Sequence, residues 1–345
     1  MMARETLQVA LVGLGYFSQF HLRAWQRIEG VDLAAVADRD RTKTDAAAQE
    51  YRTLGFAGLS AMLETIEPDI LDIVTPPPTH ATFIRQALKT GRLIICQKPF
   101  CENLDEAQAV TAEAEAAGVQ LVVHENFRFQ PWHREIKRRL DNGLLGTVYQ
   151  CRFSLRPGDG RGRDAYLDRQ PTFQQMPRFL VRETGVHFLD LFGWLFGNIV
   201  SVYSDLRQLN PVVAGEDAGI LLLQHETGVR SIFDANRLSD HAAANRRKTM
   251  GEMLIEGEVG ALRLDGEGRL FFRPFGQNRE DELPFDYEDR DFGGGCVEAL
   301  NRHVVGHIRE GHPLENRAAD YLRVVALEQA AYRSAETGRL VRNLL

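Results

Sequence analysis

The sequence predicts an α/β protein in which a doubly wound, parallel sheet is followed by a second α/β domain with a large, mostly antiparallel sheet. Between residues 9 and 124, short apolar runs alternate with helical patterns, as they do in successive βαβ units. Beyond residue 125, strand-like runs follow one another through short turns, with few helices between them. A chain of 345 residues is long for one domain, so we expect two, residues 1–125 and residues 126–345.

The first strand and helix carry the most specific pattern in the chain. Residues 9–12 are four consecutive apolar residues, which is typical of a strand buried on both faces. The chain then turns at Gly13 and Gly15, and apolar residues recur at helical spacing over residues 17–28. In a dinucleotide-binding fingerprint, the first glycine allows the tight turn and the second lets the backbone approach a pyrophosphate at the helix N-terminus. Ser18 stands at the third position of the fingerprint, where Gly or Ala is usual, and is nearly as small.

An acidic residue at the end of the second strand supports the same interpretation. Residues 33–37 form the next apolar run, and Asp38 ends it. A carboxylate there would accept hydrogen bonds from the ribose hydroxyls of the adenosine, whereas the alternative is a solvated Asp in a turn. The same charge would repel a 2′-phosphate, so we expect NAD. NADP stays possible because the cations Arg39 and Arg41 follow closely.

The remaining elements of the first domain follow in order. We expect helices over residues 45–51, 80–89 and 103–118, and strands over residues 70–74, 93–96 and 119–123. Thr79 is the expected N-cap of the second of these helices, and Gly91 its end. Asn103, with Glu106 three residues later, resembles a capping box. Gly55 and Gly58 mark a short turn.

The second domain begins with a helix and continues mainly as strands. Pro131 opens the helix, which runs to residue 142. Two long loops, residues 156–176 and 238–250, lack a periodic apolar face, and loops of this length usually bind ligands or act as lids. We expect strands over residues 148–155, 199–206, 218–223, 228–235, 252–256, 261–264 and 270–273, and closing helices over residues 295–311 and 317–338.

Composition excludes several classes of protein. A hydrophobic content of 44% with 26% charged residues is that of an ordinary globular protein, and the net charge of −7 argues against nucleic acid or an anionic membrane as partner. The four cysteines form no C-x-x-C pair, which predicts neither a disulfide framework nor a zinc site. Arg4 and Glu5 precede the first strand directly, leaving no room for a signal peptide. The longest apolar run, residues 186–202, contains Asp190 and Asn198 and is too short to span a bilayer. We therefore expect a cytoplasmic protein.

Lys98 is the first candidate catalytic residue. It comes directly after the strand 93–96 and is followed by Pro99. The carboxyl ends of parallel strands are where ligands bind, and an ammonium group there can polarise a substrate oxygen. Most lysines lie on the surface with the head group in water, but the position at a strand end favours the functional interpretation.

Glu183 and His187 are the second candidate pair. If this segment is helical, the two residues are i,i+4 neighbours, and Asp190 follows one turn further. A carboxylate beside an imidazole orients it, which suits proton transfer or substrate binding. The alternative is a core histidine packed near Phe188 and Leu189. We expect no metal, because no third ligand stands at suitable spacing.

The order of these motifs resembles the glucose–fructose oxidoreductase, inositol dehydrogenase and MocA family (Gfo/Idh/MocA). The resemblance covers nearly the whole chain and is carried by the motifs at residues 13–15, 73–80, 97–99 and 185–190 and by the C-terminal segment 330–339. It implies a Rossmann domain followed by an α/β domain whose open, mostly antiparallel sheet mediates oligomers. It also implies oxidation or reduction of a secondary alcohol or ketone of sugars and cyclitols with NAD or NADP.

The resemblance also assigns roles to residues. Lys98 of the family's E-K-P motif takes part in catalysis, and the D-x-x-x-H acid–base pair falls on Glu183 and His187. Gln97 replaces the Glu of the first motif, and Glu183 replaces the Asp of the second. The residues expected to bind the cofactor are Gly13, Gly15, Tyr16, Phe17, Asp38, Arg39, Thr75, Pro76, His80, Gln97 and Lys98, and those expected to bind substrate are Lys98, Arg128, Glu183 and His187.

The sequence thus predicts an NAD(P)-dependent oxidoreductase acting on a sugar, a cyclitol or a sugar-acid-like substrate. A nucleotide-sensing regulator without turnover, and a lyase or glycosidase that recycles bound NAD, are the alternatives. The arginines in and around the loop 156–176 could capture a carboxylate or phosphate, or be balanced by the acidic residues of the same loop. We also expect a homo-oligomer, a dimer or tetramer, because the second domain has too few helices to cover both faces of its sheet.

Overall fold

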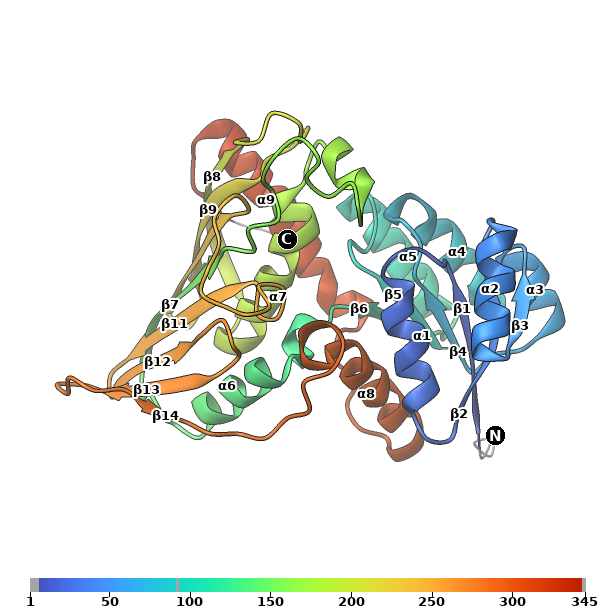
Figure 1. Ribbon diagram of the computed structural model, residues 1–345, viewed down its shortest axis with the longest axis horizontal. Helices are drawn as coiled ribbons and strands as arrows, with labels where there is room; N and C mark the ends of the chain where they lie inside the picture. Colours follow the sequence, from blue (N-terminus) through green and yellow to red (C-terminus); the bar gives the residue numbers. More distant parts are fainter. Residues whose placement is uncertain (1–5, 91–92, 343–345) are drawn as a thin grey trace. The chain divides into compact units, whose positions relative to one another are not determined.

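The computed structural model describes residues 6–90 and 93–342 and divides the chain into two compact units (Figure 1). Unit 1 comprises Met1–Asn126 and Val297–Val325, and unit 2 comprises Phe127–Cys296 and Ala326–Leu345. The expected division at residue 125 does not include this return of segment 297–325 to the first unit. The expected helix end at Gly91 lies outside the described residues.

The sheet of unit 1 is parallel throughout and has the order β3-β2-β1-β4-β5-β6, with helices on both faces (Figure 1). This order reverses direction beside β1, which creates the crevice where doubly wound folds bind ligands. The strands are β1 (Leu7–Val12), β2 (Val31–Ala37), β3 (Leu54–Phe56), β4 (Ile70–Ile73), β5 (Leu93–Gln97) and β6 (Leu121–His124). The helices are α1 (Ser18–Arg27), α2 (Arg41–Tyr51), α3 (Leu59–Thr65), α4 (His80–Ala87), α5 (Leu104–Ala116) and α8 (Cys296–Glu310), together with the first part of α9 (Ala318–Thr337). The predicted parallel, doubly wound sheet is confirmed.

Local predictions in unit 1 had mixed outcomes. The Asn103 side chain accepts a hydrogen bond from the Glu106 N–H (2.9 Å), so the expected N-cap of α5 is confirmed. Thr79 is the N-cap residue of α4, as expected, but its side chain makes no capping hydrogen bond to the helix. Its hydroxyl lies instead 2.7 Å from the Thr75 hydroxyl and 2.8 Å from the Pro76 carbonyl. The stretch around Gly55 and Gly58 holds β3 and α3 as well as turns. Each is short, which left too little periodicity to reveal it.

The returning segment 297–325 is tied to unit 1 by hydrogen bonds from residues distant in sequence. Asn301 on α8 lies 3.2 Å from the ring nitrogen Nε2 of His124, and Asn316 donates its side-chain amide to the Glu125 carbonyl. Tyr321 donates to the Glu125 carboxylate (3.1 Å). These partners give the end of β6 a polar surrounding that a sequence-local pattern cannot show.

The sheet of unit 2 has the order β14-β13-β12-β11-β7-β10-β9-β8-β15, and its pairs are antiparallel except for β7 with β10. The prediction of a large, mostly antiparallel sheet is therefore confirmed. The strands are β7 (Val148–Leu155), β8 (Ile199–Arg207), β9 (Ala218–His225), β10 (Arg230–Asn236), β11 (Gly251–Gly257), β12 (Gly260–Leu264), β13 (Leu270–Pro274), β14 (Asp281–Glu282) and β15 (Val341–Arg342). The last two have two residues each, and the sequence did not predict them.

Helices cover one face of this sheet, and none of the helices in the described part of the chain lies on the other face (Figure 1). The covering helices include α6 (Pro131–Asp141) and α7 (Val186–Phe196). Phe188 of α7 packs between Phe153 of β7 and Phe233 of β10, with ring centroids 4.1 and 4.9 Å apart. Among the helices of the described residues, none combines the length and hydropathy that a bilayer crossing requires.

Candidate functional site

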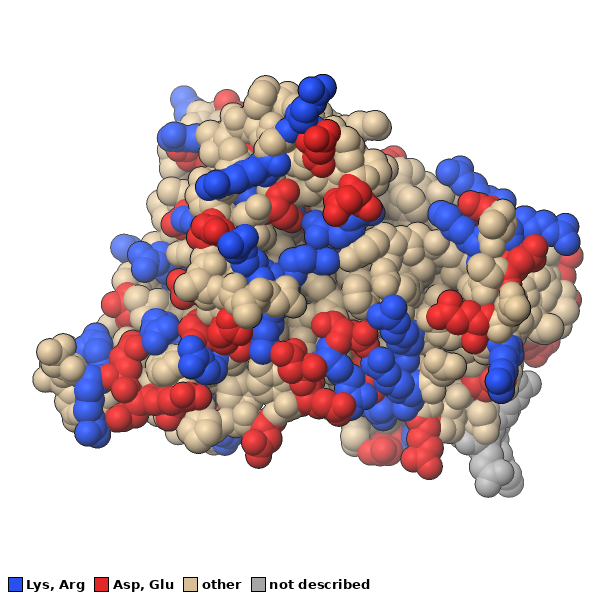
Figure 2. Space-filling view, viewed as in Figure 1, with Lys and Arg blue, Asp and Glu red and all other residues tan. Residues whose placement is uncertain are grey.

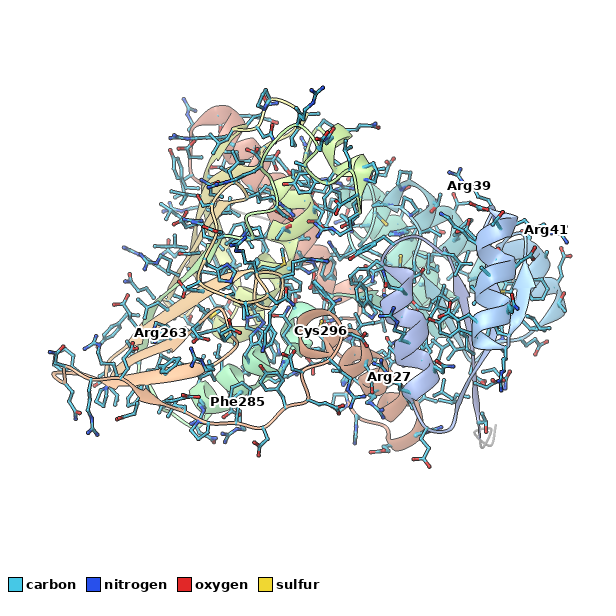
Figure 3. All side chains as sticks on the ribbon, viewed as in Figure 1. Arg27, Arg39, Arg41, Arg263, Phe285 and Cys296 are labelled. Atoms are coloured by element: carbon cyan, nitrogen blue, oxygen red, sulfur yellow. The ribbon has the colours of Figure 1, made fainter. Side chains whose placement is uncertain are left out.

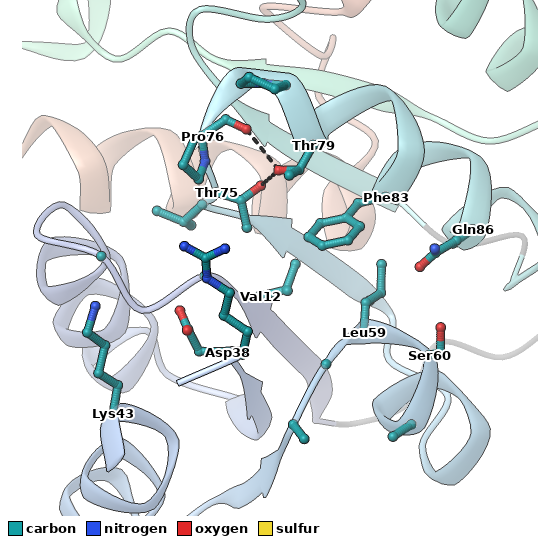
Figure 4. Close-up of a pocket in the computed structure, with 18 residues that line it drawn as sticks. Val12, Asp38, Lys43, Leu59, Ser60, Thr75, Pro76, Thr79, Phe83 and Gln86 are labelled. Carbon is teal, nitrogen blue, oxygen red and sulfur yellow. Dashed lines mark hydrogen bonds between the residues drawn. The ribbon is translucent and has the colours of Figure 1, made fainter. Parts of the chain in front are cut away.

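A cavity of about 870 Å³ opens at the carboxyl edge of the unit 1 sheet (Figure 4). It lies where the strand order reverses, and the ends of β1, β2 and β4 contribute to its wall. Among the expected cofactor residues, those that line it are Gly13, Gly15, Asp38, Arg39, Thr75 and Pro76. The volume and position suit a nucleotide.

The glycine turn after β1 has the geometry that a dinucleotide requires. Gly13 has φ +100°, and a Cβ on it would lie 2.6 Å from the Val74 carbonyl oxygen, so only glycine fits. A Cβ on Gly15 would meet nothing within 4 Å, which means that open space lies against the backbone at this point. Helix α1 then begins at Ser18 with no acidic residue in its first turn, so its positive end is available to a phosphate. These residues fit NAD.

Asp38 holds the turn as well as facing the cavity. Its carboxylate accepts hydrogen bonds from the N–H groups of Leu14 (2.7 Å) and Asp40 (2.8 Å). Arg39 and Lys43 also line the cavity, and Figure 4 shows Lys43 directed towards it. Arg41, at the outer edge of the unit in Figure 3, is mostly exposed and pairs with Asp45. The cations that can reach a cofactor phosphate are therefore Arg39 and Lys43 rather than Arg41.

The other expected cofactor residues, Tyr16, Phe17, His80, Gln97 and Lys98, are not among the residues that line this cavity. His80 is buried, with its ring nitrogens 2.9 Å from the Phe100 carbonyl and 2.7 Å from the Thr75 carbonyl, and burial lowers its pKa. It therefore supports the loop that lines the cavity. Tyr16 and Phe17 precede α1 and pack their rings against Phe20.

Lys98 directly follows β5 and is half-buried. In the parallel register, Ile73 of β4 pairs with Cys96 of β5, which brings Thr75 and Lys98 to the same level of the sheet edge. The Lys98 N–H donates to the side-chain oxygen of Gln97 (3.2 Å). The amide nitrogen of Gln97 in turn lies 2.8 Å from Nε2 of His21.

The second candidate constellation lies in unit 2, at a change of helix type. Glu183 belongs to a π-helix, Leu180–Gly185, and His187 to α7, which continues it. The expected single helix with i,i+4 spacing is therefore interrupted. Single π-helical turns within α-helices are frequent at functional sites. The buried carboxylate of Glu216 accepts hydrogen bonds from the N–H groups of Phe179 and Val181 and fixes the start of this helix.

Arg237, which the sequence did not single out, holds Glu183 and the loop 156–176 together. Its buried guanidinium donates to Asp159 through Nε (3.1 Å) and Nη2 (2.8 Å), and to Glu183 (3.3 Å) and Thr184 (2.9 Å) through Nη1. Burial would lower the pKa of Arg237, but the charge of Asp159 outweighs it and raises the pKa. A single arginine after a strand gives no signal of this kind, because its partners are distant in sequence.

The expected substrate residues His187 and Arg128 both contact aromatic or acidic neighbours in unit 2. The His187 ring stacks on Phe127, with centroids 3.8 Å apart and planes 3° apart. Arg128 donates from Nε to Asp190 (2.8 Å) and from Nη2 to the other oxygen of the same carboxylate. Two N–H groups of the Arg128 guanidinium are thus directed to Asp190.

The arginines around the loop 156–176 are mostly paired within unit 2. Arg156 pairs with Asp234, Arg169 with Asp159 and Arg182 with Glu328. The loop itself packs Tyr166 and Phe173 into a buried cluster with Phe179 and Val213. Arg169 is therefore balanced by an acidic residue of the same loop, whereas Arg156 and Arg182 pair with residues outside it. On the face seen in Figure 2, basic and acidic side chains are interspersed. Across residues 6–90 and 93–342, no group of three or more His, Cys, Asp or Glu is placed to hold a metal ion.

Comparisons of the sequence with known proteins agree with a nucleotide site in unit 1. The model of an oxidoreductase family with an NAD-binding Rossmann fold matches residues 7–125, and a Gfo/Idh/MocA C-terminal domain matches residues 133–263. A D-apiose dehydrogenase of Paraburkholderia graminis is 34% identical over 96% of this chain and 88% of its own length. A second, from Rhizobium rhizogenes, is 30% identical over 97% of both chains.

A solved structure extends the likeness to the whole fold. An oxidoreductase from Agrobacterium radiobacter, in complex with NAD+, L-tartaric acid and magnesium, superposes with a TM-score of 0.88, at 28% identity over 98% of both chains. The resemblance inferred from the motifs and the expectation of NAD are confirmed. The chain belongs to the Gfo/Idh/MocA family of NAD-binding oxidoreductases, and it is an enzyme of the dehydrogenase type.

Proposed function

We propose that this enzyme uses NAD to oxidise a carbinol carbon of a sugar or a closely related polyol. The observation that carries the proposal is the cavity at the switch point of the unit 1 sheet, with Lys98 at the same sheet edge. The similarity to two D-apiose dehydrogenases over nearly the whole chain supports a sugar as substrate. The pairing of the loop arginines within unit 2 speaks against a requirement for an anionic substrate.

Each residue has a distinct task in this proposal. Bound NAD supplies the hydride acceptor, while the chain positions it and excludes water. Gly13, Gly15 and Asp38 hold the pyrophosphate and ribose end. Lys98 polarises the substrate oxygen and stabilises the charge that develops on it. The pair Glu183 and His187 takes up the proton that leaves the hydroxyl group.

A fluorescence screen for NADH formation tests the proposal directly. The panel contains D-apiose, other aldoses, cyclitols and matched sugar–uronic acid pairs. We expect turnover with a neutral sugar and a lower kcat/KM for its uronic acid. Retained NAD binding with no turnover across the panel would contradict the proposal and favour a regulator. Consumption of a substrate without net NADH would instead indicate a lyase or glycosidase that recycles the cofactor.

Cofactor choice should depend on Asp38. We expect NAD to bind more tightly than NADP, because the Asp38 carboxylate lines the cavity and repels a 2′-phosphate. Asp38→Ala should narrow the difference between the NAD and NADP affinities. It should also weaken the binding of both cofactors, since it removes the acceptor of the Leu14 N–H. Asp38→Asn, which keeps an acceptor oxygen, should narrow the difference with less loss of NAD affinity. Isothermal titration with both cofactors measures the two ratios.

The matched control for cofactor choice is Asp45→Ala. This variant also removes one negative charge, but from α2, where the Asp45 carboxylate is exposed and paired with Arg41. This variant should keep the wild-type ratio of affinities. Equal affinity of the unmodified protein for NAD and NADP would contradict the role of Asp38.

We also propose that the uncovered face of the unit 2 sheet binds a second copy of the chain. Tyr203, Ile220 and Leu222 are exposed on neighbouring strands of this face, and Tyr203 pairs with Leu222 across β8 and β9. Exposed apolar side chains that adjoin one another across a sheet are characteristic of interfaces. Light scattering at micromolar concentration should show a dimer or tetramer rather than a 38.9 kDa particle.

A charge on this face should separate the copies. Leu222→Glu is expected to shift the particle towards the monomer, because a carboxylate cannot be buried unpaired in an interface. Leu54→Glu, which changes an exposed leucine of β3 in unit 1, is the control and should not alter the mass. A monomeric wild-type protein, or an unchanged mass for Leu222→Glu, speaks against this interface.

A further inference from the structure

A chain of hydrogen bonds runs from a buried carboxylate to the backbone of Lys98. Asp72 lies in the middle of the otherwise apolar β4 and is fully buried. Its Oδ2 is 2.7 Å from Nδ1 of His21 and accepts a second bond from the Trp25 indole N–H (2.7 Å). Burial raises the pKa of Asp72, whereas the hydrogen bonds that it accepts from His21 and Trp25 lower it, and the net shift is downwards.

The direction of each bond in this chain follows from its end at Lys98. A backbone N–H can only donate, so the Gln97 atom 3.2 Å from the Lys98 nitrogen must be the amide oxygen. The amide NH₂ of Gln97 therefore points to Nε2 of His21, at 2.8 Å, and this nitrogen must accept. The remaining ring nitrogen, Nδ1, carries the proton that is donated to Asp72. An imidazolium would require the amide to turn over, which would set two N–H donors against each other at Lys98.

We propose that Asp72, His21 and Gln97 form a relay that positions Lys98, and that Gln97 keeps His21 neutral with its proton on Nδ1. The role of the relay rests on the proposed function of Lys98, whereas the charge state of His21 does not. Within this relay His21, Gln97 and Asp72 are positioning residues. They act through the backbone of Lys98, which lies at the same sheet edge as Thr75.

A second buried histidine packs against the relay. The His124 ring of β6 lies against His21, with centroids 4.2 Å apart, and burial lowers the pKa of His124 to about 3. Cys96 of β5 is also buried, and its pKa is raised, so it is an uncharged thiol beside Asp72. His124 and Cys96 are therefore uncharged neighbours of Asp72.

The family's glutamate at this position would change the protonation of His21. In Gln97→Glu, one carboxylate oxygen still accepts from the Lys98 N–H, and the other faces Nε2 of His21. Since two carboxylates then flank the ring, both of its nitrogens must donate, and His21 takes up one proton. The added negative charge and the added proton cancel, so the relay keeps a net charge of minus one and the variant should fold.

Two measurements test the relay. The first is long-range proton–nitrogen NMR of the full-length protein labelled with ¹⁵N-histidine, with the His21 signal identified by its loss in His21→Gln. If that variant does not fold, Asp72→Asn identifies the signal by its displacement. We expect one protonated and one unprotonated nitrogen in the wild type, and two protonated nitrogens in Gln97→Glu at neutral pH.

The second measurement is the pH dependence of kcat and of NAD affinity. In Gln97→Glu, kcat should fall at high pH, because a ring without its second proton faces a carboxylate with a lone pair. The wild-type enzyme should show no such decrease in kcat. Removing the relay in His21→Gln should lower kcat about 10–100-fold, as loss of an outer partner of an active-site group does, with little change in the NAD dissociation constant.

A matched control exists in the same unit. The Gln120 amide nitrogen lies 2.8 Å from Nε2 of His307, the same contact as between Gln97 and His21, but it is exposed. Gln120→Glu should leave kcat and its pH profile unchanged.

The outcomes separate the relay from the function of Lys98. An imidazolium at His21 in the wild type, or a Gln97→Glu enzyme with the wild-type pH profile and a neutral His21, overturns the proposal. If instead the NMR results are as expected while Lys98→Met turns over normally, the charge assignment stands and the proposed function of Lys98 fails.

Discussion

Replacing Lys98 by methionine is expected to lower turnover by roughly 10²–10⁴-fold and to leave the NAD dissociation constant nearly unchanged. Methionine keeps most of the apolar stem and removes the ammonium group, so the loss would report the charge alone. The cavity wall made by Gly13, Gly15 and Asp38 is untouched by this change, which is why cofactor affinity should persist. Stopped-flow measurement of NADH formation and titration of NAD binding give the two quantities.

The control for this variant is Lys89→Met. Lys89 is an exposed lysine in the 3₁₀ turn after α4, and its replacement should preserve both turnover and NAD affinity. Wild-type turnover in Lys98→Met would show that Lys98 takes no part in catalysis. Loss of NAD binding in that variant would instead give Lys98 a role in holding the cofactor.

The sequence was sufficient for the parallel sheet between β1 and β6, apart from β3, because the signals there are local. The apolar run before Gly13, the two glycines and the helix after them follow one another along the chain, and their structure depends on close neighbours. The same holds for the cap at Asn103. The strand β3 was missed because three residues with one half-buried position carry almost no periodicity.

The contacts of the candidate site were harder to predict from the sequence, because the residues that bond one another come from distant segments. The sequence did not single out Asp72, because nothing local shows that His21 and Trp25 bond it. The spacing of Glu183 and His187 predicted a regular helix. The structure has a π-helix there, whose start is fixed by the carboxylate of Glu216, more than thirty positions later. Roles for these side chains stay predictions until variants are measured.

Replacing Arg237 by methionine is expected to lower the free energy of unfolding by about 1–3 kcal/mol, the usual cost of leaving buried hydrogen-bond acceptors unsatisfied. The guanidinium is 2% exposed and bonds Asp159 through two nitrogens and Glu183 and Thr184 through the third, and after its removal Asp159 keeps only its pairing with Arg169 among these contacts. Equilibrium unfolding in urea measures the change. Arg207→Met is the matched control, because Arg207 and Asp205 are 66% and 49% exposed and such pairs contribute about 1 kcal/mol or less.

Arg237→Lys tests whether the same residue also serves the proposed acid–base pair. Lysine keeps the positive charge near Asp159 but lacks the planar fork that reaches Glu183 and Thr184 at the same time. We therefore expect a folded enzyme with part of the lost stability restored and a reduced kcat, since Glu183 is held less firmly, while NAD affinity is unchanged. A wild-type kcat in Arg237→Lys would restrict Arg237 to a structural role, and a fully stable Arg237→Met would contradict the buried ion pair itself.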